Sequence, residues 1–182
     1  MQLKDTGSRF GSIAQFFHWI VAVLVLTQYY LVYWTEWVLP KKSPQAIFYI
    51  SGLHKPIGVL LLLLIFLAFC WRVSNSRPTF PSTMAKWEKI AAHLTHMLLA
   101  LCVLVMAMSG LIMSTAAGYP PNFFGLYQIP TFISANKALS QLCFNIHVIT
   151  SYALISLIGL HVLAALKHHF IDKDPVLKRM LP

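Results

Sequence analysis

His147 and His161 lie fourteen residues apart within the apolar stretch FNIHVITSYALISLIGLH. On an α-helix this spacing covers nearly four turns, so the two imidazole rings share one face and lie about 21 Å apart along the helix axis. An imidazole among Val, Ile, Leu and Ala side chains must be hydrogen-bonded or metal-bound, because leaving it unpaired costs about 1–3 kcal/mol. Two haems, one at each depth, would satisfy both rings.

The composition places this stretch in a membrane. Of the 182 residues, 58% are hydrophobic and only 10% are charged, which leaves too little polar surface for a soluble domain. Hydrophobic runs long enough to cross a hydrocarbon core of about 30 Å occur at residues 14–38, 54–73, 91–116 and 144–166. Residues 1–182 are therefore predicted to form one all-α domain, an integral membrane four-helix bundle. The first run is too long for a cleaved signal peptide, and no small-residue cleavage site follows it.

The basic residues predict the orientation of this bundle. Ten of them fall on the side that holds both termini and four on the other, so the positive-inside rule makes both termini cytoplasmic. The net charge of +9 is then a topology signal that also attracts anionic lipid headgroups. A nucleic-acid partner is excluded, because there is no soluble basic domain to bind one. The ten are Lys4, Arg9, Arg72, Arg77, Lys86, Lys89, Lys167, Lys173, Lys178 and Arg179, and the four are Lys41, Lys42, Lys55 and Lys137.

Depth in the membrane pairs the histidines. His18 lies near the cytoplasmic start of the first run and His54 at the outer start of the second. The fourth run leads inward, so His147 lies near the outer surface and His161 lies deeper. His54 therefore matches His147, and His18 matches His161, as two bis-histidine haem sites in a bundle core require. A zinc site is disfavoured, because it needs four ligands within about 2.0–2.3 Å of one point and these rings form two layers.

Small residues accompany these histidines. Gly58 follows His54 by one turn, Ser151 follows His147 by one turn, and Gly110 and Gly159 lie inside their helices. A missing or small side chain lets a flat macrocycle approach a helix closely, although packing of one helix on another has the same requirement.

The three cysteines bear on how a haem would be held. Cys70, Cys102 and Cys143 lie in or beside apolar runs and form no C-x-x-C-H motif. Any haem is therefore expected to be bound without thioether links, and the cysteines are expected to be small packing residues.

At this point the chain resembles the bacterial cytochrome b-561 family of four-helix, di-haem inner-membrane proteins. The resemblance covers nearly the whole chain and implies two non-covalent haems b held by His18, His54, His147 and His161. Some members are similar to superoxide oxidases, which take an electron from superoxide at the outer side and pass it through the haems to ubiquinone. The matching motifs are H-W (His18, Trp19), a His with Gly four later (His54, Gly58), A-H-x-x-H (Ala92, His93, His96), H-x13-H closing in G-L-H (His147, Gly159, Leu160, His161) and a His-His pair (His168, His169).

Other residues at the cytoplasmic level are candidates for contacts with the inner haem or the quinone. His93 and His96 are one turn apart and could bond a haem propionate or pass a proton; the alternative is an interfacial pair that meets headgroups and water. Arg72 could pair with propionates or act as an ordinary positive-inside anchor. His168 lies two turns beyond His161 on nearly the same face, where it could bond a quinone carbonyl or simply be solvated.

The outer face is predicted to attract small anions. Lys41, Lys42, Lys55 and Lys137 are opposed only by Glu36, so the net charge of this face is +3, which would draw superoxide towards it. Lys55 and Lys137 are the candidate substrate-site residues; the alternative is scattered, solvated lysines. The superoxide oxidase-like relatives are expected to carry an Arg after the third helix, where this chain reads STAAGYPP, so one of the four lysines would have to take its place.

The stretch from 117 to 143 is too long and too aromatic for a plain connector. Its aromatic residues alternate with prolines and predict a fold that lies over the outer haem at the membrane surface. The aromatic residues are Tyr119, Phe123, Phe124, Tyr127 and Phe132.

Two other functions are compatible with the sequence. One is a quinone-linked cytochrome b subunit, or an electron carrier, that serves a partner dehydrogenase or hydrogenase. The other is a haem-free transporter or scaffold lined by histidines, which intramembrane Asp or Glu would favour. The four runs contain no Asp, and Glu36 lies at the end of the first.

Overall fold

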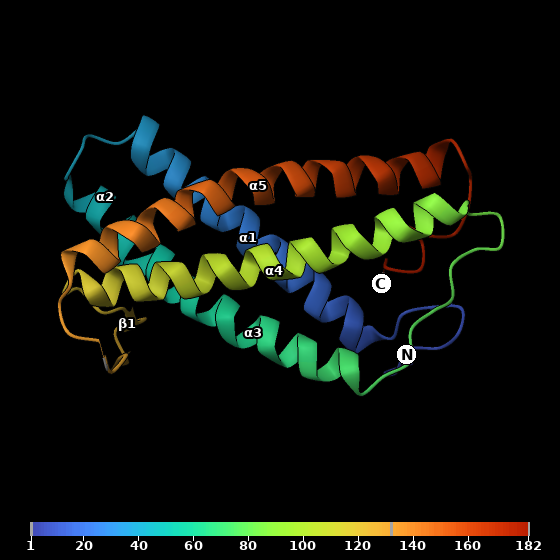
Figure 1. The fold of residues 1–182 in the computed structure, drawn as a ribbon, viewed down its shortest axis with the longest axis horizontal. Coiled ribbons are helices and arrows are strands. Elements are labelled where there is room, and N and C mark those ends of the chain that lie inside the picture. Colours follow the sequence, from blue (N-terminus) through green and yellow to red (C-terminus); the bar gives the residue numbers. More distant parts are fainter. Residues whose placement is uncertain (1, 132, 182) are drawn as a thin grey trace.

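The computed structural model describes residues 2–131 and 133–181, so the predicted position of Phe132 lies outside the described residues. Four helical segments in it are long and apolar enough to cross a membrane: Ser12–Trp37, Pro44–Val73, Lys86–Ala116 and Lys137–Phe170. They are α1 (Ser12–Trp37), the composite of α2, η1 and α3, α4 (Lys86–Ala116) and α5 (Lys137–Phe170) (Figure 1). The prediction of a helical membrane bundle with four spans is confirmed.

The helices are longer than the apolar runs that predicted them. α4 begins at Lys86 instead of residue 91, and α5 covers Lys137–Phe170 instead of 144–166. Hydropathy marks only the part of a helix inside the hydrocarbon, whereas backbone hydrogen bonds continue into the polar interface. The Asn136 side chain accepts a hydrogen bond from the Leu139 amide at 3.0 Å and so starts α5 before its apolar part begins.

The second span is a composite helix. It consists of α2 (Pro44–Ile47), a π-helical segment η1 (Phe48–His54) and α3 (Lys55–Val73). Pro56 has no N–H for the carbonyl four residues earlier, so a regular α-helix cannot pass through it unchanged. The backbone instead pairs residues five apart, as the Lys55 N–H does with the Ile50 carbonyl, and this wider turn ends on His54.

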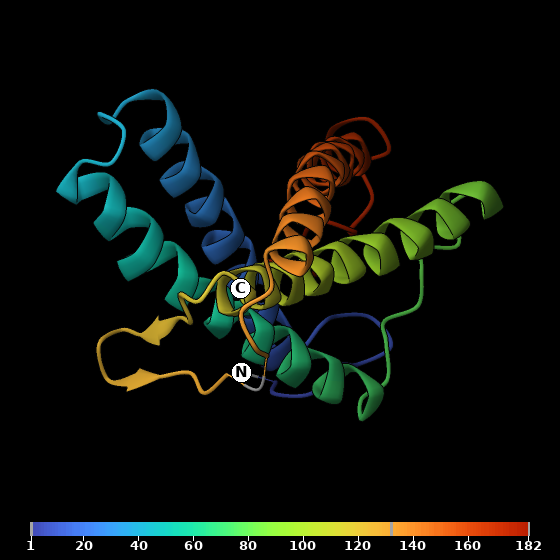
Figure 2. The same ribbon diagram turned by 60° about the vertical axis from the view of Figure 1, so that its left-hand side comes forward.

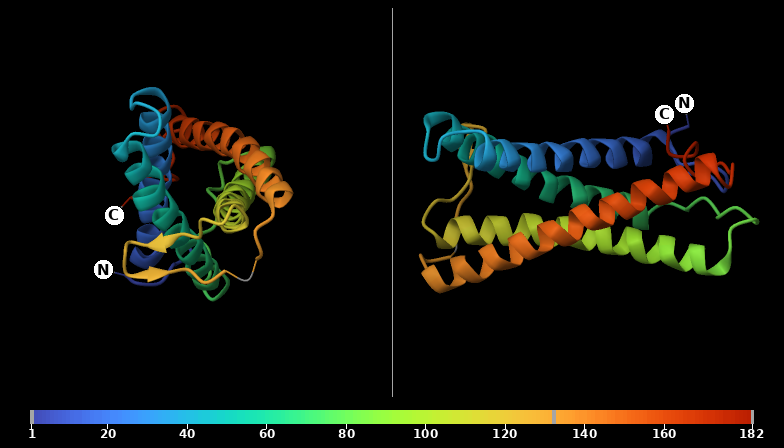
Figure 3. Two further views of the ribbon diagram at one scale, coloured as in Figure 1. Left: turned by 90° about the vertical axis from the view of Figure 1, so that its left-hand side faces the viewer. Right: turned by 90° about the horizontal axis from the view of Figure 1, so that it is seen from above.

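The helices pack in the order α1, α3, α4, α5, with the most extensive contact between α4 and α5 (Figure 3). Buried apolar side chains from all four spans meet in one cluster of Val25, Leu31, Ile57, Leu61, Val103 and Leu154. Among the described residues, α1 and α5 meet chiefly through side chains rather than by close backbone packing. One such link is the Tyr29 hydroxyl, which donates to the Ser151 carbonyl at 2.6 Å.

The two ends of the bundle differ, and we refer to them as the hairpin end and the termini end. The hairpin end carries α2 and a two-stranded antiparallel hairpin, β1 (Asn122–Phe123) and β2 (Tyr127–Gln128) (Figure 2). The termini end carries the first and last described residues and the connection between α3 and α4 (Figure 1). For residues 117–143, between α4 and α5, the sequence predicted a folded segment but not the two strands. The turn between the strands includes Gly125 at φ +79°.

The segment after α5 is fastened to the start of α1. The Trp19 indole N–H donates to the Met180 carbonyl at 2.9 Å, and the buried Gln15 amide donates to the Leu181 carbonyl at 2.8 Å. Arg9 also donates to the Leu181 carbonyl, at 2.9 Å. These bonds hold the chain back across the termini end, close to the level of His18.

The outer faces of the helices are apolar and exposed. Phe66, Phe69, Ile149 and Tyr152 each expose 62–70% of their surface. Surfaces of this kind on every span would be unstable in water, but they match lipid chains, while the helices satisfy their own backbone hydrogen bonds. The chain is a multi-pass membrane protein.

Candidate functional site

One histidine pair lies near the hairpin end. The ring centres of His54, at the end of η1, and His147, on α5, are 6.2 Å apart, and the ring planes make an angle of 71°. The wide turn before Pro56 places His54 where it faces α5. We call these residues the hairpin-end pair.

A second pair lies towards the termini end. His18 on α1 and His161 on α5 have ring centres 6.1 Å apart and an interplanar angle of 60°. We call these residues the termini-end pair. Each pair therefore joins α5 to a different segment on the opposite side of the bundle, at one of two depths separated by the helix rise between His147 and His161.

The separations within the pairs fit an iron atom between the rings. A coordinating imidazole nitrogen lies about 2.0–2.1 Å from a metal ion and its ring centre roughly 1.2 Å further back, so opposed ligands have ring centres about 6.4–6.6 Å apart. The observed 6.1 and 6.2 Å lie just below this range, so a small outward shift of the rings would admit an iron atom. Planes at 60° and 71° are compatible with it, because each ring needs only to contain the metal–nitrogen axis.

The His147 ring is held in the orientation of a metal ligand. Its Nδ1 lies 3.0 Å from the Met106 carbonyl oxygen and 3.1 Å from the Ser109 hydroxyl. Because a carbonyl only accepts, Nδ1 carries the proton and Nε2 keeps its lone pair for a metal. A Cβ at Gly110 would lie 3.1 Å from the His147 Cε1 atom, so glycine leaves the room that this ring occupies. Met106 and Ser109 gave no signal in the sequence.

His54 has a different environment. Its Nδ1 is shielded from solvent and has no hydrogen-bond partner among the described residues. Gln28 of α1 lies beside it and donates its amide N–H to the His54 carbonyl at 2.9 Å. Gly58 packs against the Gln28 side-chain amide, because a Cβ at Gly58 would lie 3.4 Å from the Gln28 Nε2 atom.

The structure separates His93 from His96. The His96 ring centre lies 5.1 Å from that of His161, and its Nδ1 donates to the Ala92 carbonyl at 2.6 Å. Since 5.1 Å is too short for two opposed ligands, His96 lies beside the termini-end pair and not across an iron from His161. His93 packs edge-on against Phe80 at 5.0 Å, away from that pair. Arg72 lies in the last turn of α3, at the termini end of the bundle.

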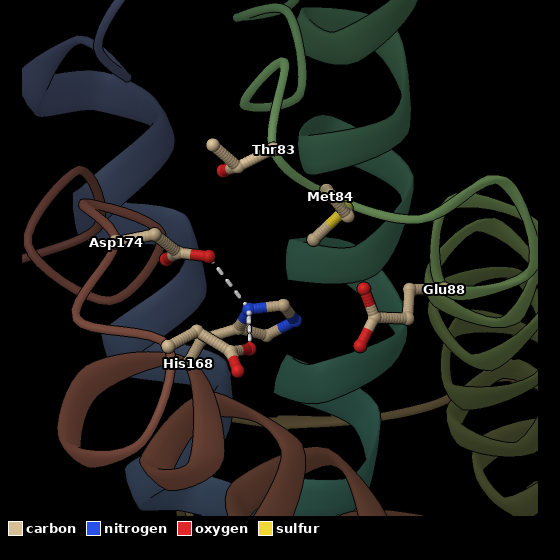
Figure 4. A pocket seen from close by; sticks show the side chains of 6 residues that line it. Thr83, Met84, Glu88, His168 and Asp174 are labelled. Atoms are coloured by element: carbon tan, nitrogen blue, oxygen red, sulfur yellow. Dashed lines mark hydrogen bonds and ion pairs between the residues drawn. The ribbon is translucent and has the colours of Figure 1, made fainter.

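His168 lies in a polar cluster beyond the termini-end pair (Figure 4). Its Nδ1 lies 2.7 Å from a carboxylate oxygen of Asp174 and 3.0 Å from one of Asp172. The ring lines a cavity of about 280 Å³ whose other lining residues are Thr83, Met84, Glu88, Asp172 and Asp174. Figure 4 shows the ring between Asp174 and Glu88. With Nδ1 bonded to a carboxylate, His168 keeps Nε2 for exchange of a proton.

Lys167 joins this cluster to α4. Its ammonium group lies 2.5 Å from Glu88 and 2.7 Å from Asp172. No motif or spacing in the sequence marks Glu88, Asp172 or Asp174 as a site residue. Asp172 and Asp174 follow the end of α5, where helical periodicity no longer predicts which side chains meet.

The structure does not gather the candidate lysines of the hairpin end into one cluster. Lys55 donates to the Tyr119 carbonyl at 3.2 Å and lies 6.0 Å from the centre of the Tyr119 ring. Lys137, at the start of α5, lines a different cavity of about 470 Å³. Lys41 forms an ion pair with Glu36. Lys55 is thus the candidate lysine adjacent in sequence to the hairpin-end pair.

The arrangement as a whole suits electron transfer. A haem with two imidazole ligands has no open coordination position, so it exchanges electrons at its edge and does not bind oxygen or peroxide at the iron. Two such sites on one helix, at different depths, would make a path through the bundle.

The chain is similar to known proteins over most of its length. A family model described as prokaryotic cytochrome b561 matches residues 9–182. Cytochrome b561 homolog 2 of Escherichia coli K12 is 32% identical over 100% of this chain and 95% of its own length. Cytochrome b561 homolog 1 of the same organism is 28% identical over 96% and 98%. A protein named probable superoxide oxidase CybB, from Yersinia pestis, is 26% identical over 91% of both chains.

Proposed function

The chain belongs to the prokaryotic cytochrome b561 family, which binds haem b and transfers electrons across the membrane, and we propose that it moves electrons from superoxide to ubiquinone through two haems b. The observation that carries the proposal is the presence of two histidine pairs with ring centres 6.1 and 6.2 Å apart at two depths. His54 and His147 would hold one haem, and His18 and His161 the other. Haem b supplies a one-electron Fe(III)/Fe(II) couple.

The orientation in this proposal follows from charge. Ten of the fourteen basic residues belong to the termini end and its flanking segments, so this end faces the cytoplasm of a bacterial inner membrane. The hairpin end then faces the periplasm. Two superoxide ions each lose one electron there and leave as oxygen, and one ubiquinone takes up two electrons and two cytoplasmic protons at the termini end.

Charge at the hairpin end supports an anionic donor. Glu36 is paired with Lys41, so Lys42, Lys55 and Lys137 give this end its net charge of +3. Such a field raises the local concentration of a small anion and its rate of encounter. Tyr119 holds Lys55 in place next to His54. One relative of the chain is named a probable superoxide oxidase, which also supports superoxide as the donor.

Rapid mixing with superoxide tests the proposal directly. The purified protein should show the spectrum of reduced haem b sooner than superoxide dismutates by itself, and added ubiquinone should return the spectrum to the oxidised form. Reduction slower than dismutation would reject superoxide as the donor. If quinol reduced the same sample rapidly, the protein would instead be a quinol-linked carrier for a partner enzyme.

Replacing Lys55 by methionine should slow reduction by superoxide about threefold to tenfold, because one cation next to the donor site is lost. The dependence of the rate on ionic strength should weaken in parallel. The measurement is the pseudo-first-order rate of haem reduction over a series of salt concentrations. Lys55→Arg keeps the charge and serves as the control, with a rate near that of the wild type. Equal rates for Lys55→Met and the wild type would exclude Lys55 from the donor site.

At the other end, His168 is the proposed quinone contact. The cavity of about 280 Å³ beside it is large enough for a single-ring headgroup. Asp174 accepts the Nδ1 proton of His168 and fixes the ring, so that Nε2 faces the cavity and can bond a quinone carbonyl or deliver a proton to it. Arg72 and His96 would interact with the carboxylates of the haem at the termini-end pair.

Replacing His168 by glutamine should slow haem oxidation by ubiquinone by about 10²-fold, the lower range for loss of a general acid. Reduction by superoxide should be unchanged, since the hairpin-end pair is far from this residue. Single-turnover reoxidation after photochemical reduction separates the two steps. The matched control is His169→Gln, because the His169 ring packs on Phe170 at 4.7 Å and does not line the cavity. Equal reoxidation rates for the two variants would refute the assignment.

A further inference from the structure

The two histidine pairs differ in what bonds the far side of each ring. In the hairpin-end pair, the His147 Nδ1 is bonded to the Met106 carbonyl and the Ser109 hydroxyl, at 3.0 and 3.1 Å. In the termini-end pair, neither His18 nor His161 has a ring hydrogen bond to any residue in the ranges 2–131 and 133–181. The two histidine pairs therefore differ in the hydrogen bonds made by their ring nitrogens.

Gln28 extends this inequality to the other ring of the hairpin-end pair. Its amide nitrogen is already bonded to the His54 carbonyl at 2.9 Å and lies against the open side of Gly58. Within the described chain, the Gln28 Oε1 atom and the His54 Nδ1 atom are both shielded from solvent and both without a hydrogen-bond partner. An amide oxygen can only accept, and the Nδ1 of a ring that binds iron through Nε2 can only donate. The two atoms are complementary, and their residues are already joined.

We propose that Gln28 is a positioning residue for the haem at the hairpin end: its Oε1 accepts the Nδ1 proton of His54, and this haem consequently has the lower reduction potential of the two. The inference rests on the proposed function, because it takes each histidine pair to hold one haem. A carbonyl or amide acceptor on Nδ1–H makes an axial imidazole more basic, which favours Fe(III) over Fe(II). At the hairpin end, His147 has such acceptors in the Met106 carbonyl and the Ser109 hydroxyl, and Gln28 would supply one to His54. In the part of the chain that the structure describes, no residue bonds the ring of His18 or His161 in this way.

The direction of electron transfer follows from this difference. With a haem in each pair, one electron would pass from the iron held by His54 and His147 to the iron held by His18 and His161, which would oxidise the first, reduce the second and need no proton. Both ends of the bundle carry a basic residue of α3, Lys55 next to His54 and Arg72 in the last turn of the helix. The acceptors on Nδ1 are therefore the clearest asymmetry between the sites.

Redox titration of the purified protein, monitored by haem absorbance with mediators, tests the inference. Gln28→Leu removes the acceptor at similar volume, and Ser109→Ala removes one of the two partners of His147. Each should raise the potential of the low-potential component and leave the other unchanged. The expected change in electron distribution between the haems is about threefold to tenfold, which corresponds to about 30–60 mV for a one-electron couple. Gln28→Glu retains an acceptor with stronger charge and should lower the same component.

Thr27→Val provides the matched control on α1. The Thr27 hydroxyl bonds only the Val23 carbonyl of its own helix, at 2.9 Å, so both potentials should match those of the wild type. Unchanged potentials in Gln28→Leu, or a shift of the other component alone, would refute the inference, as would a rise in Gln28→Glu. The readout needs neither superoxide nor quinone. If superoxide proved not to be the donor, the inference about Gln28 would therefore still stand. If replacing His147 removed no haem, the assignment of the histidine ligands, on which the inference rests, would be refuted.

Discussion

Replacing His161 by alanine is expected to remove one of two haems and leave the other. His161 is the α5 member of the termini-end pair, and a non-covalent haem that loses one of its two imidazole ligands is held by too few interactions to survive purification. The haem content should fall from about two to about one per chain. The remaining haem should still be reduced by superoxide, but it should no longer pass electrons to ubiquinone. Haem extraction with a protein assay, and a redox titration, measure these effects.

The reciprocal variant makes the test specific. His147→Ala should also leave about one haem, but it should retain the component that His161→Ala lost. Together the two variants show which haem spectrum and which reduction potential belong to the hairpin-end pair and which to the termini-end pair. His169→Ala, which changes a histidine outside both pairs on the same helix, should keep both haems. Full haem content in His161→Ala would contradict the assignment of this residue as a ligand.

Replacing Gly110 by valine is expected to remove the haem of the hairpin end without changing any histidine. A Cβ at this position would lie 3.1 Å from Cε1 and 3.3 Å from Nδ1 of His147, and valine adds two further methyl groups. The ring would have to leave its bonds with the Met106 carbonyl and Ser109, so Nε2 would no longer point at the iron. About half of the haem should be lost, and the lost component should be the one missing in His147→Ala.

Gly159 offers a matched control for this substitution. It is also a helix-interior glycine, on α5, but a Cβ there would meet nothing within 4 Å. Gly159→Val changes helix propensity by the same amount as Gly110→Val but causes no collision with His147. If both lost the same amount of haem, the effect of Gly110→Val would be general and the steric explanation would fail.

The parts of the molecule that could be predicted depend on helix geometry. Apolar runs of sufficient length predicted four spans, because a hydrocarbon core of fixed thickness demands them. The fixed rise per residue then ordered the histidines by depth, and in the structure His54 lies beside His147 and His18 beside His161. Both predictions need only distances along one helix axis and the direction in which each span runs.

The contacts that orient the rings could not be predicted, because they depend on rotation about the helix axis. Ser109 is one of several small residues in α4, and only the packing of α4 on α5 shows that it meets His147. Gln28 meets His54 because the π-helical turn before Pro56 rotates this histidine, and a hydropathy pattern does not contain that rotation.

The termini end was the hardest part to predict. Asp174 lies beyond the last helix, in a segment without regular secondary structure, yet it provides the closest partner of His168. Its backbone N–H donates to the His168 carbonyl at 3.1 Å, and the chain that follows it is held to α1 through residues 179–181. Tertiary contacts of this kind produce no periodic pattern of residues, so the sequence alone does not predict them.

The attachment of residues 179–181 to Arg9, Gln15 and Trp19 also sets an order of assembly. A ribosome makes these three partners before the other three spans and makes the segment that they bind after those spans. The start of α1 therefore lacks these hydrogen bonds while the other three spans are inserted into the membrane. The hydrogen bonds that close the termini end can therefore form only after all four spans have been made.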